Sequence, residues 1–84
     1  MSKLEKQIER LKSKPKDYTY DELKSLLNKL GFMENNKGKT SGSAIEFKYE
    51  DGRKITLHKP HPSNIIKPYI IRAITKSLKE WRLI

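Results

Sequence analysis

The feature that most constrains the fold is a pair of alternating segments on either side of Asp51-Gly52. Hydrophobic residues occupy every second position in both, at 45, 47 and 49 and again at 55 and 57. This pattern is typical of strands with one buried face, and an Asp-Gly step favours a tight hairpin between them. A two-residue loop would break the hydrophobic face. A three-residue loop with Gly52 at the bulge position keeps it continuous and pairs Phe47 with Ile55.

This register also decides which residues share the solvent face of the hairpin. It places Ile45 opposite Leu57 on the buried face. On the solvent face it places Ala44 opposite His58, and the other outward residues are Glu46, Lys48, Lys54 and Thr56. The pattern therefore predicts two half-buried strands, one starting near residue 43 and one covering 54–58.

Amphipathic helices are expected on both sides of the hairpin. The sequence of residues 19–22, Thr-Tyr-Asp-Glu, matches a capping box, and Gly31 suits the left-handed residue that follows a helix. These two signals predict a helix over 20–30. Pro68 suits a first helical turn, and the apolar residues after it recur at spacings of three and four, which predicts a helix over 68–82.

The remaining segments complete an α+β domain. Residues 1–14 are expected to form a short helical extension, which Pro15 ends, before a domain over 15–84. Residues 32–35 suit a short first strand, and the polar segment 36–43 predicts an exposed loop. The order α-β-β-β-α then predicts a two-layer sandwich, with both helices on one face of a three-stranded antiparallel sheet. The other face is left to solvent or a ligand.

The chain is strongly basic for its length. Its 84 residues include 19 Lys and Arg against 10 Asp and Glu, a formal net charge of +9. Such a charge favours nucleic acid, an anionic membrane surface or an acidic protein as partner. The chain has no Cys and only two His, too few for a metal site, and it carries no cofactor motif. It also lacks a membrane-spanning segment and a secretion signal, so we expect a cytoplasmic protein without a cofactor.

Three stretches taken together resemble the HicA toxin family. They are Leu26 to Phe32, the loop Gly38-Lys39-Thr40-Ser41-Gly42-Ser43, and Leu57-His58-Lys59-Pro60-His61-Pro62. The resemblance covers roughly residues 17–81. It implies a fold similar to a double-stranded RNA-binding domain and an endoribonuclease activity on mRNA that arrests translation and growth. It also implies a HicB-type antitoxin that binds and silences the toxin.

Position 44 departs from the family pattern. In many family members the Gly-Ser pair is followed by His, and in a subgroup by Arg, whereas this chain has Ala44. A methyl group neither transfers a proton nor binds a phosphate. If this position carries the family's chemistry, the chain is therefore an inactivated form of the enzyme.

Two histidines are the candidates for proton transfer. Metal-free RNA cleavage needs a base for the 2′-OH, an acid for the leaving 5′-oxygen and cations for the charge on phosphorus. Imidazole titrates near neutrality, so His58 and His61 are the predicted catalytic residues beside position 44, with simple phosphate binding as the alternative role. The residues predicted to bind RNA lie in the Gly-containing loop and at the borders of the open sheet face: Lys37, Lys39, Thr40, Ser41, Ser43, Lys48, Lys54 and Lys59.

Three functions remain open at this point. The first is an RNA-cleaving toxin neutralised by an antitoxin. The second is a non-catalytic RNA-binding module of the same fold. The third is an interaction protein whose cationic surface binds an acidic partner.

Overall fold

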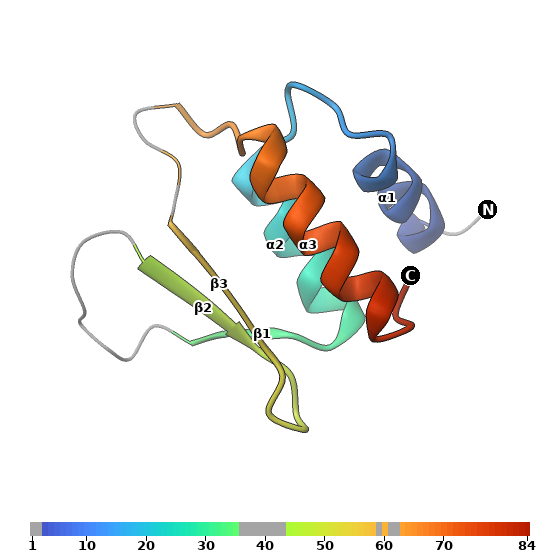
Figure 1. Cartoon of the computed structure of the whole chain (residues 1–84), viewed down its shortest axis with the longest axis vertical. Helices are drawn as coiled ribbons and strands as arrows, with labels where there is room; N and C mark the ends of the chain where they lie inside the picture. The colour runs from blue at the N-terminus through green and yellow to red at the C-terminus, as the bar shows by residue number, and fades with distance from the viewer. Residues whose placement is uncertain (1–2, 36–43, 59, 61–62) are drawn as a thin grey trace.

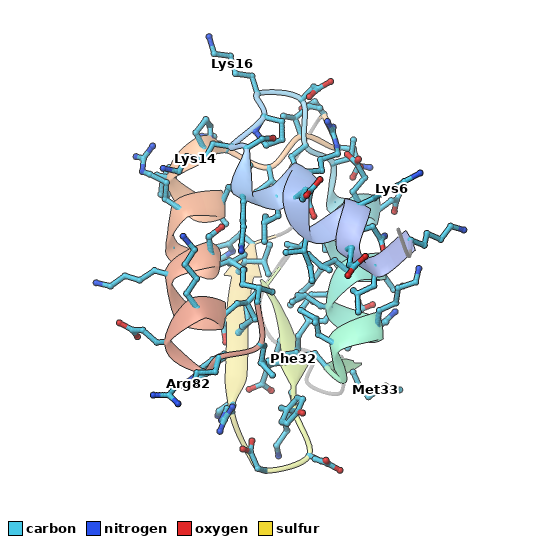
Figure 2. All side chains as sticks on the ribbon, turned by 90° about the vertical axis from the view of Figure 1, so that its right-hand side faces the viewer. Lys6, Lys14, Lys16, Phe32, Met33 and Arg82 are labelled. Atoms are coloured by element: carbon cyan, nitrogen blue, oxygen red, sulfur yellow. The ribbon has the colours of Figure 1, made fainter. Side chains whose placement is uncertain are left out.

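Helices back one face of a small antiparallel sheet in this computed structural model, which describes residues 3–35, 44–58, 60 and 63–84. The elements are α1 (Lys3–Lys12), α2 (Tyr20–Leu30), β1 (Met33–Asn35), β2 (Ala44–Lys48), β3 (Lys54–His58) and α3 (Pro68–Glu80). The strand order is β1-β2-β3. α2 and α3 cover one face of the sheet, and α1 packs on these helices from the side away from the sheet (Figure 1, Figure 2). The predicted α+β fold is confirmed.

The helix α2 has the bounds that its capping signals predict. The Thr19 hydroxyl accepts a hydrogen bond from the Glu22 N–H at 3.2 Å, and the Glu22 carboxylate accepts one from the Thr19 N–H at 3.0 Å. At the other end Gly31 is left-handed, with φ 108°, and the Phe32 N–H donates to the Leu27 carbonyl at 2.8 Å. This second bond turns the Phe32 ring back into the core, where it is fully buried.

The two glycines with positive φ offer a matched stability test. Gly31 and Gly52 have φ of 108° and 100°, so an Ala at either position is strained by about 1 to 2 kcal/mol. A Cβ at Gly31 would also lie 2.7 Å from Cε1 of Tyr49, whereas one at Gly52 would have nothing within 4 Å. We expect Gly31→Ala to lower the free energy of unfolding by roughly 1 to 3 kcal/mol more than Gly52→Ala. Equal losses in urea unfolding would contradict the steric contact.

The hairpin of β2 and β3 has the predicted register. Phe47 lies opposite Ile55, and the Tyr49 N–H donates to the Arg53 carbonyl at 2.8 Å, which leaves a three-residue loop that ends at Gly52. Ile55 and Phe47 are buried under the helices, as the alternation indicated. The core of the domain joins these strands to all three helices through the side chains of Leu11, Leu23, Leu26, Leu27, Ile45, Phe47, Ile55, Leu57, Ile71, Ile74 and Leu78.

A short bridge joins the segments that precede α2 and α3. Thr19 pairs with Ile65 in an isolated antiparallel bridge. The Tyr20 N–H donates to the Asn64 carbonyl at 2.9 Å, and the Ile66 N–H donates to the Tyr18 carbonyl at 2.8 Å. These bonds hold the first turns of the two helices together at one end of the domain.

Two element boundaries differ from the predicted ones. The first strand was expected from Phe32 but begins at Met33, because the Phe32 N–H is used in the helix cap. The last helix was expected to reach Arg82 but ends at Glu80, because Arg82 takes a positive φ of 59° and the Leu83 N–H donates to the Leu78 carbonyl. The predicted loop 36–43 lies outside the described residues.

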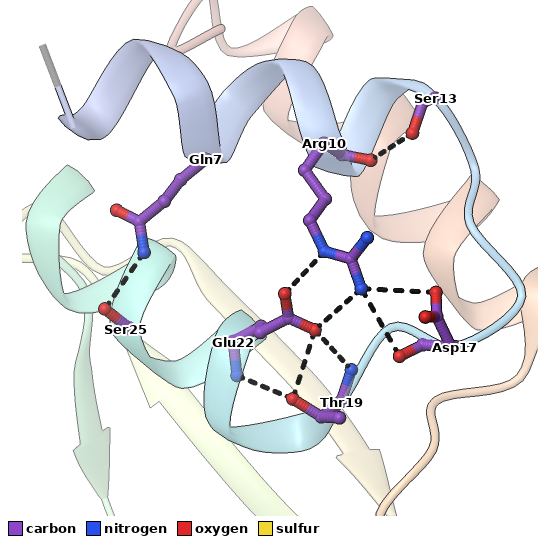
Figure 3. A network of polar contacts seen from close by, with 7 residues as sticks. All are labelled: Gln7, Arg10, Ser13, Asp17, Thr19, Glu22 and Ser25. Atoms are coloured by element: carbon purple, nitrogen blue, oxygen red, sulfur yellow. Dashed lines mark hydrogen bonds and ion pairs between the residues drawn. The ribbon is translucent and has the colours of Figure 1, made fainter.

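The helix α1 is attached to α2 by polar contacts (Figure 3) and by the buried side chain of Leu11. The Arg10 guanidinium donates to both carboxylate oxygens of Glu22, at 3.0 Å for Oε1, and to Asp17 Oδ1 at 3.2 Å. These hydrogen bonds hold the pKa of Glu22 below its ordinary value. The Gln7 amide donates to Ser25 at 3.1 Å, and Leu11 is fully buried. The predicted N-terminal extension thus contributes to the core.

Candidate nucleic-acid interface

The face of the sheet that the described helices leave uncovered brings together residues from all three strands (Figure 1). Pairing of β1 with β2 and of β2 with β3 aligns eight positions in three rows. We call these eight positions the outer face: Met33, Lys48 and Lys54 in the first row, Asn35, Glu46 and Thr56 in the second, and Ala44 and His58 in the third.

The third row contains the pair on which the predicted chemistry depends. His58 is the last residue of β3 and lies directly opposite Ala44, the first residue of β2. The His58 side chain is exposed to solvent. An imidazole that is exposed to solvent beside position 44 is accessible to a bound polyanion, because it is not buried in the apolar core.

The first row contains two of the predicted RNA-binding lysines. Lys48 and Lys54 lie opposite each other, and both are exposed. Like charges at directly opposed positions destabilise a strand pair, and the ion pair of Lys54 with Glu46 offsets part of this repulsion. His58 is four positions after Lys54 along β3, a distance of about 13 Å in a strand. The lysine pair and His58 therefore lie at opposite ends of the outer face.

The middle row contains a carboxylate that the sequence analysis placed on this face without a role. Glu46 lies opposite Asn35 on one side and Thr56 on the other, so it is at the centre of the outer face. Its Oε2 is 3.4 Å from the Nζ of Lys54, and its side chain is 29% exposed. The sequence showed that Glu46 points outward. Its central place depends on the pairing with β1, which no local pattern specified.

The other seven predicted site residues are not described by the structure. Those outside the described residues are Lys37, Lys39, Thr40, Ser41, Ser43, Lys59 and His61. The structure therefore brings together Ala44 and His58 at one end of the outer face and Lys48 and Lys54 at the other.

Met33 is a further residue of the outer face that the sequence analysis did not single out. Its side chain is 68% exposed, which is unusual for a large apolar residue, and it lies opposite Lys48. Its thioether is thus an exposed apolar group beside Lys48, in the same row as Lys54. The signal in the sequence was weak, because a three-residue strand shows little alternation.

Two general features of the described residues bear on the class of site. Within the described ranges, no group of three or more His, Cys, Asp or Glu side chains is placed to hold a metal ion. In the same part of the chain, no helix has the length and apolar character needed to cross a bilayer.

Comparison with known proteins assigns the family. A family model described as the HicA toxin of bacterial toxin-antitoxin matches residues 20–80, from the first residue of α2 to the last residue of α3. No curated protein and no solved structure gives a significant match. The family match covers well over half of the 84 residues and includes every element of the sheet. The chain therefore belongs to the HicA family of toxins from bacterial toxin-antitoxin pairs, a membership that implies a cognate antitoxin as its partner.

Proposed function

We propose that this toxin is an endoribonuclease that cleaves mRNA in the cytoplasm, arrests translation and growth, and is silenced by a HicB-type antitoxin. The observation that carries the proposal is the exposed imidazole of His58 directly opposite position 44 on the outer face. Imidazole is suited to proton transfer near neutral pH. The position next to it is the one at which family members have His or Arg.

The proposed chemistry needs no metal ion. His58, with His61 as the second candidate, transfers protons to or from the 2′-oxygen and the leaving 5′-oxygen. Lys48 and Lys54 bind phosphates along the strand. A formal net charge of +9 on 84 residues supports attraction of a polyanion of any sequence. The remaining proposed RNA contacts come from the loop before β2 and from Lys59.

A cleavage assay on three forms of the protein tests this function. The forms are the chain with Ala44 and the variants Ala44→Arg and Ala44→His. If position 44 supplies a charge or a proton to the reaction, both variants should cleave RNA at least about 10²-fold faster than the Ala44 chain. A nuclease function would be refuted if none of the three forms cleaved RNA while all three bound it.

Ala44 itself favours one alternative, a non-catalytic RNA-binding module. A methyl group at this position leaves the lysines of the outer face able to bind phosphates but removes a reactive group next to His58. Such a module would give binding without cleavage in all three forms. Failure to bind RNA at low salt, together with co-purification of an acidic protein, would instead support a protein-interaction role.

A further inference from the structure

We propose that Glu46 is a catalytic residue of this toxin, the general base that takes the proton from the 2′-OH of the RNA, with His58 as the general acid. This inference rests on the proposed nuclease function. It assigns a role to a carboxylate for which neither the sequence analysis nor the family match provides one.

The position of Glu46 is the first argument. It follows position 44 by two residues on β2, on the same face, about 7 Å further along the strand. It is also the diagonal neighbour of His58, because Glu46 pairs with Thr56 and Ala44 pairs with His58. Diagonal neighbours across two strands are about 7 to 8 Å apart, within reach of long side chains. A phosphodiester group can therefore lie between the carboxylate and the imidazole.

The chemistry available on the outer face is the second argument. Cleavage needs two proton-transfer groups, and of the described outer-face residues Glu46 is the one carboxylate and His58 the one imidazole. The Lys54 ammonium lies 3.4 Å from the Glu46 carboxylate, on the side away from His58, so the carboxylate leaves this ion pair when it turns toward a 2′-OH beside His58. A protonated ammonium cannot accept a proton, so Lys54 binds phosphate and does not act as the base.

The reaction balances with these two groups. The Glu46 carboxylate takes the 2′-OH proton as the 2′-oxygen forms a bond to phosphorus, and the bond from phosphorus to the 5′-oxygen breaks. The His58 imidazolium gives its proton to that 5′-oxygen. The products are a 2′,3′-cyclic phosphate and a 5′-hydroxyl end. Solvent then returns the proton from the Glu46 carboxyl to the His58 imidazole.

A purely structural role for Glu46 makes different predictions. The cross-strand ion pair with Lys54 stabilises the sheet whether or not RNA is bound. In addition, a carboxylate at the centre of a phosphate-binding face repels RNA. Removal of the charge should therefore leave RNA binding unchanged or tighter if Glu46 is the base, while cleavage falls. Loss of a structural contact would weaken binding and cleavage together.

The test uses Glu46→Gln in the full chain, in the most active of the Ala44, Ala44→Arg and Ala44→His forms. Glu50→Gln, in the exposed hairpin loop, is the matched control for loss of one negative charge. We expect kcat to fall at least about 10²-fold. Affinity for a 2′-O-methylated RNA, which cannot be cleaved, should stay the same or increase. Glu50→Gln should behave like the parent.

A second variant keeps the test decisive if Glu46→Gln is unstable. Glu46→Ala should be inactive alone and should regain part of its rate when formate is added, because formate supplies the missing carboxylate. Cleavage by Glu46→Gln at the parent rate, or a joint loss of binding and cleavage without rescue by formate, would overturn the role of Glu46. Lack of cleavage in all three forms at position 44 would overturn the nuclease function itself. This result differs from failure of the Glu46 role, because the parent protein then shows no cleavage before Glu46 is changed.

Discussion

Replacement of His58 by Gln is expected to slow RNA cleavage by about 10²- to 10⁴-fold, measured in the most active form at position 44. The physical reason is that His58, exposed at the end of β3 and directly opposite position 44, is the proposed proton donor to the leaving oxygen. Gln keeps the size and polarity of the side chain but cannot transfer a proton. Binding to a 2′-O-methylated RNA should therefore change little.

Two further variants make this experiment interpretable. His61→Gln tests the second predicted imidazole in the same assay. Lys76→Gln, on the exposed side of α3, removes one positive charge away from the outer face and should leave cleavage unchanged. If RNA decayed at the parent rate in both His58→Gln and His61→Gln, neither imidazole would belong to the mechanism.

Leu11→Ala is expected to lower the free energy of unfolding by about 2 to 5 kcal/mol, a large part of the stability of so small a domain. The residue lies in α1, outside the region that matches the family model, yet its side chain is fully buried. Removal of three carbons there leaves a cavity between α1 and the helices that it covers (Figure 2).

Urea unfolding followed by circular dichroism measures this loss. Lys6→Ala is the control, because Lys6 is on the same helix and is exposed to solvent (Figure 2). It should change the free energy of unfolding by less than about 0.5 kcal/mol. A loss for Leu11→Ala as small as that of Lys6→Ala would mean that α1 is detached from the domain in solution.

The elements with strong local signals could be predicted closely. The capping box at Thr19 and the left-handed Gly31 gave both ends of α2, because each cap depends on hydrogen bonds within a few residues. The continuity of the buried face gave the register of the hairpin, including Ala44 opposite His58. The predicted start of the first strand at Phe32 was wrong by one residue, and the predicted end of the last helix at Arg82 was wrong by two. At both places the chain leaves a helix, and backbone N–H groups there form bonds that close the helix end.

The candidate site could be predicted only in part. Alternation identified which residues of β2 and β3 point outward, and so placed His58 beside position 44. It could not show that Glu46 is at the centre of the face, because that depends on the pairing of Asn35 with Glu46 across residues far apart in the chain. A strand of three residues has too few alternating positions to specify its own partner.

The sequence by itself determined the type and order of the helices and strands, one hairpin register and the positive charge, because caps, turns and alternation act over a few neighbouring residues. The tertiary structure alone decided which residues from distant segments meet. It attached α1 to the domain through Arg10 and Leu11, paired Thr19 with Ile65, and set the register of β1 against β2. These contacts form only when the folded chain buries a shared core, so no local pattern encodes them.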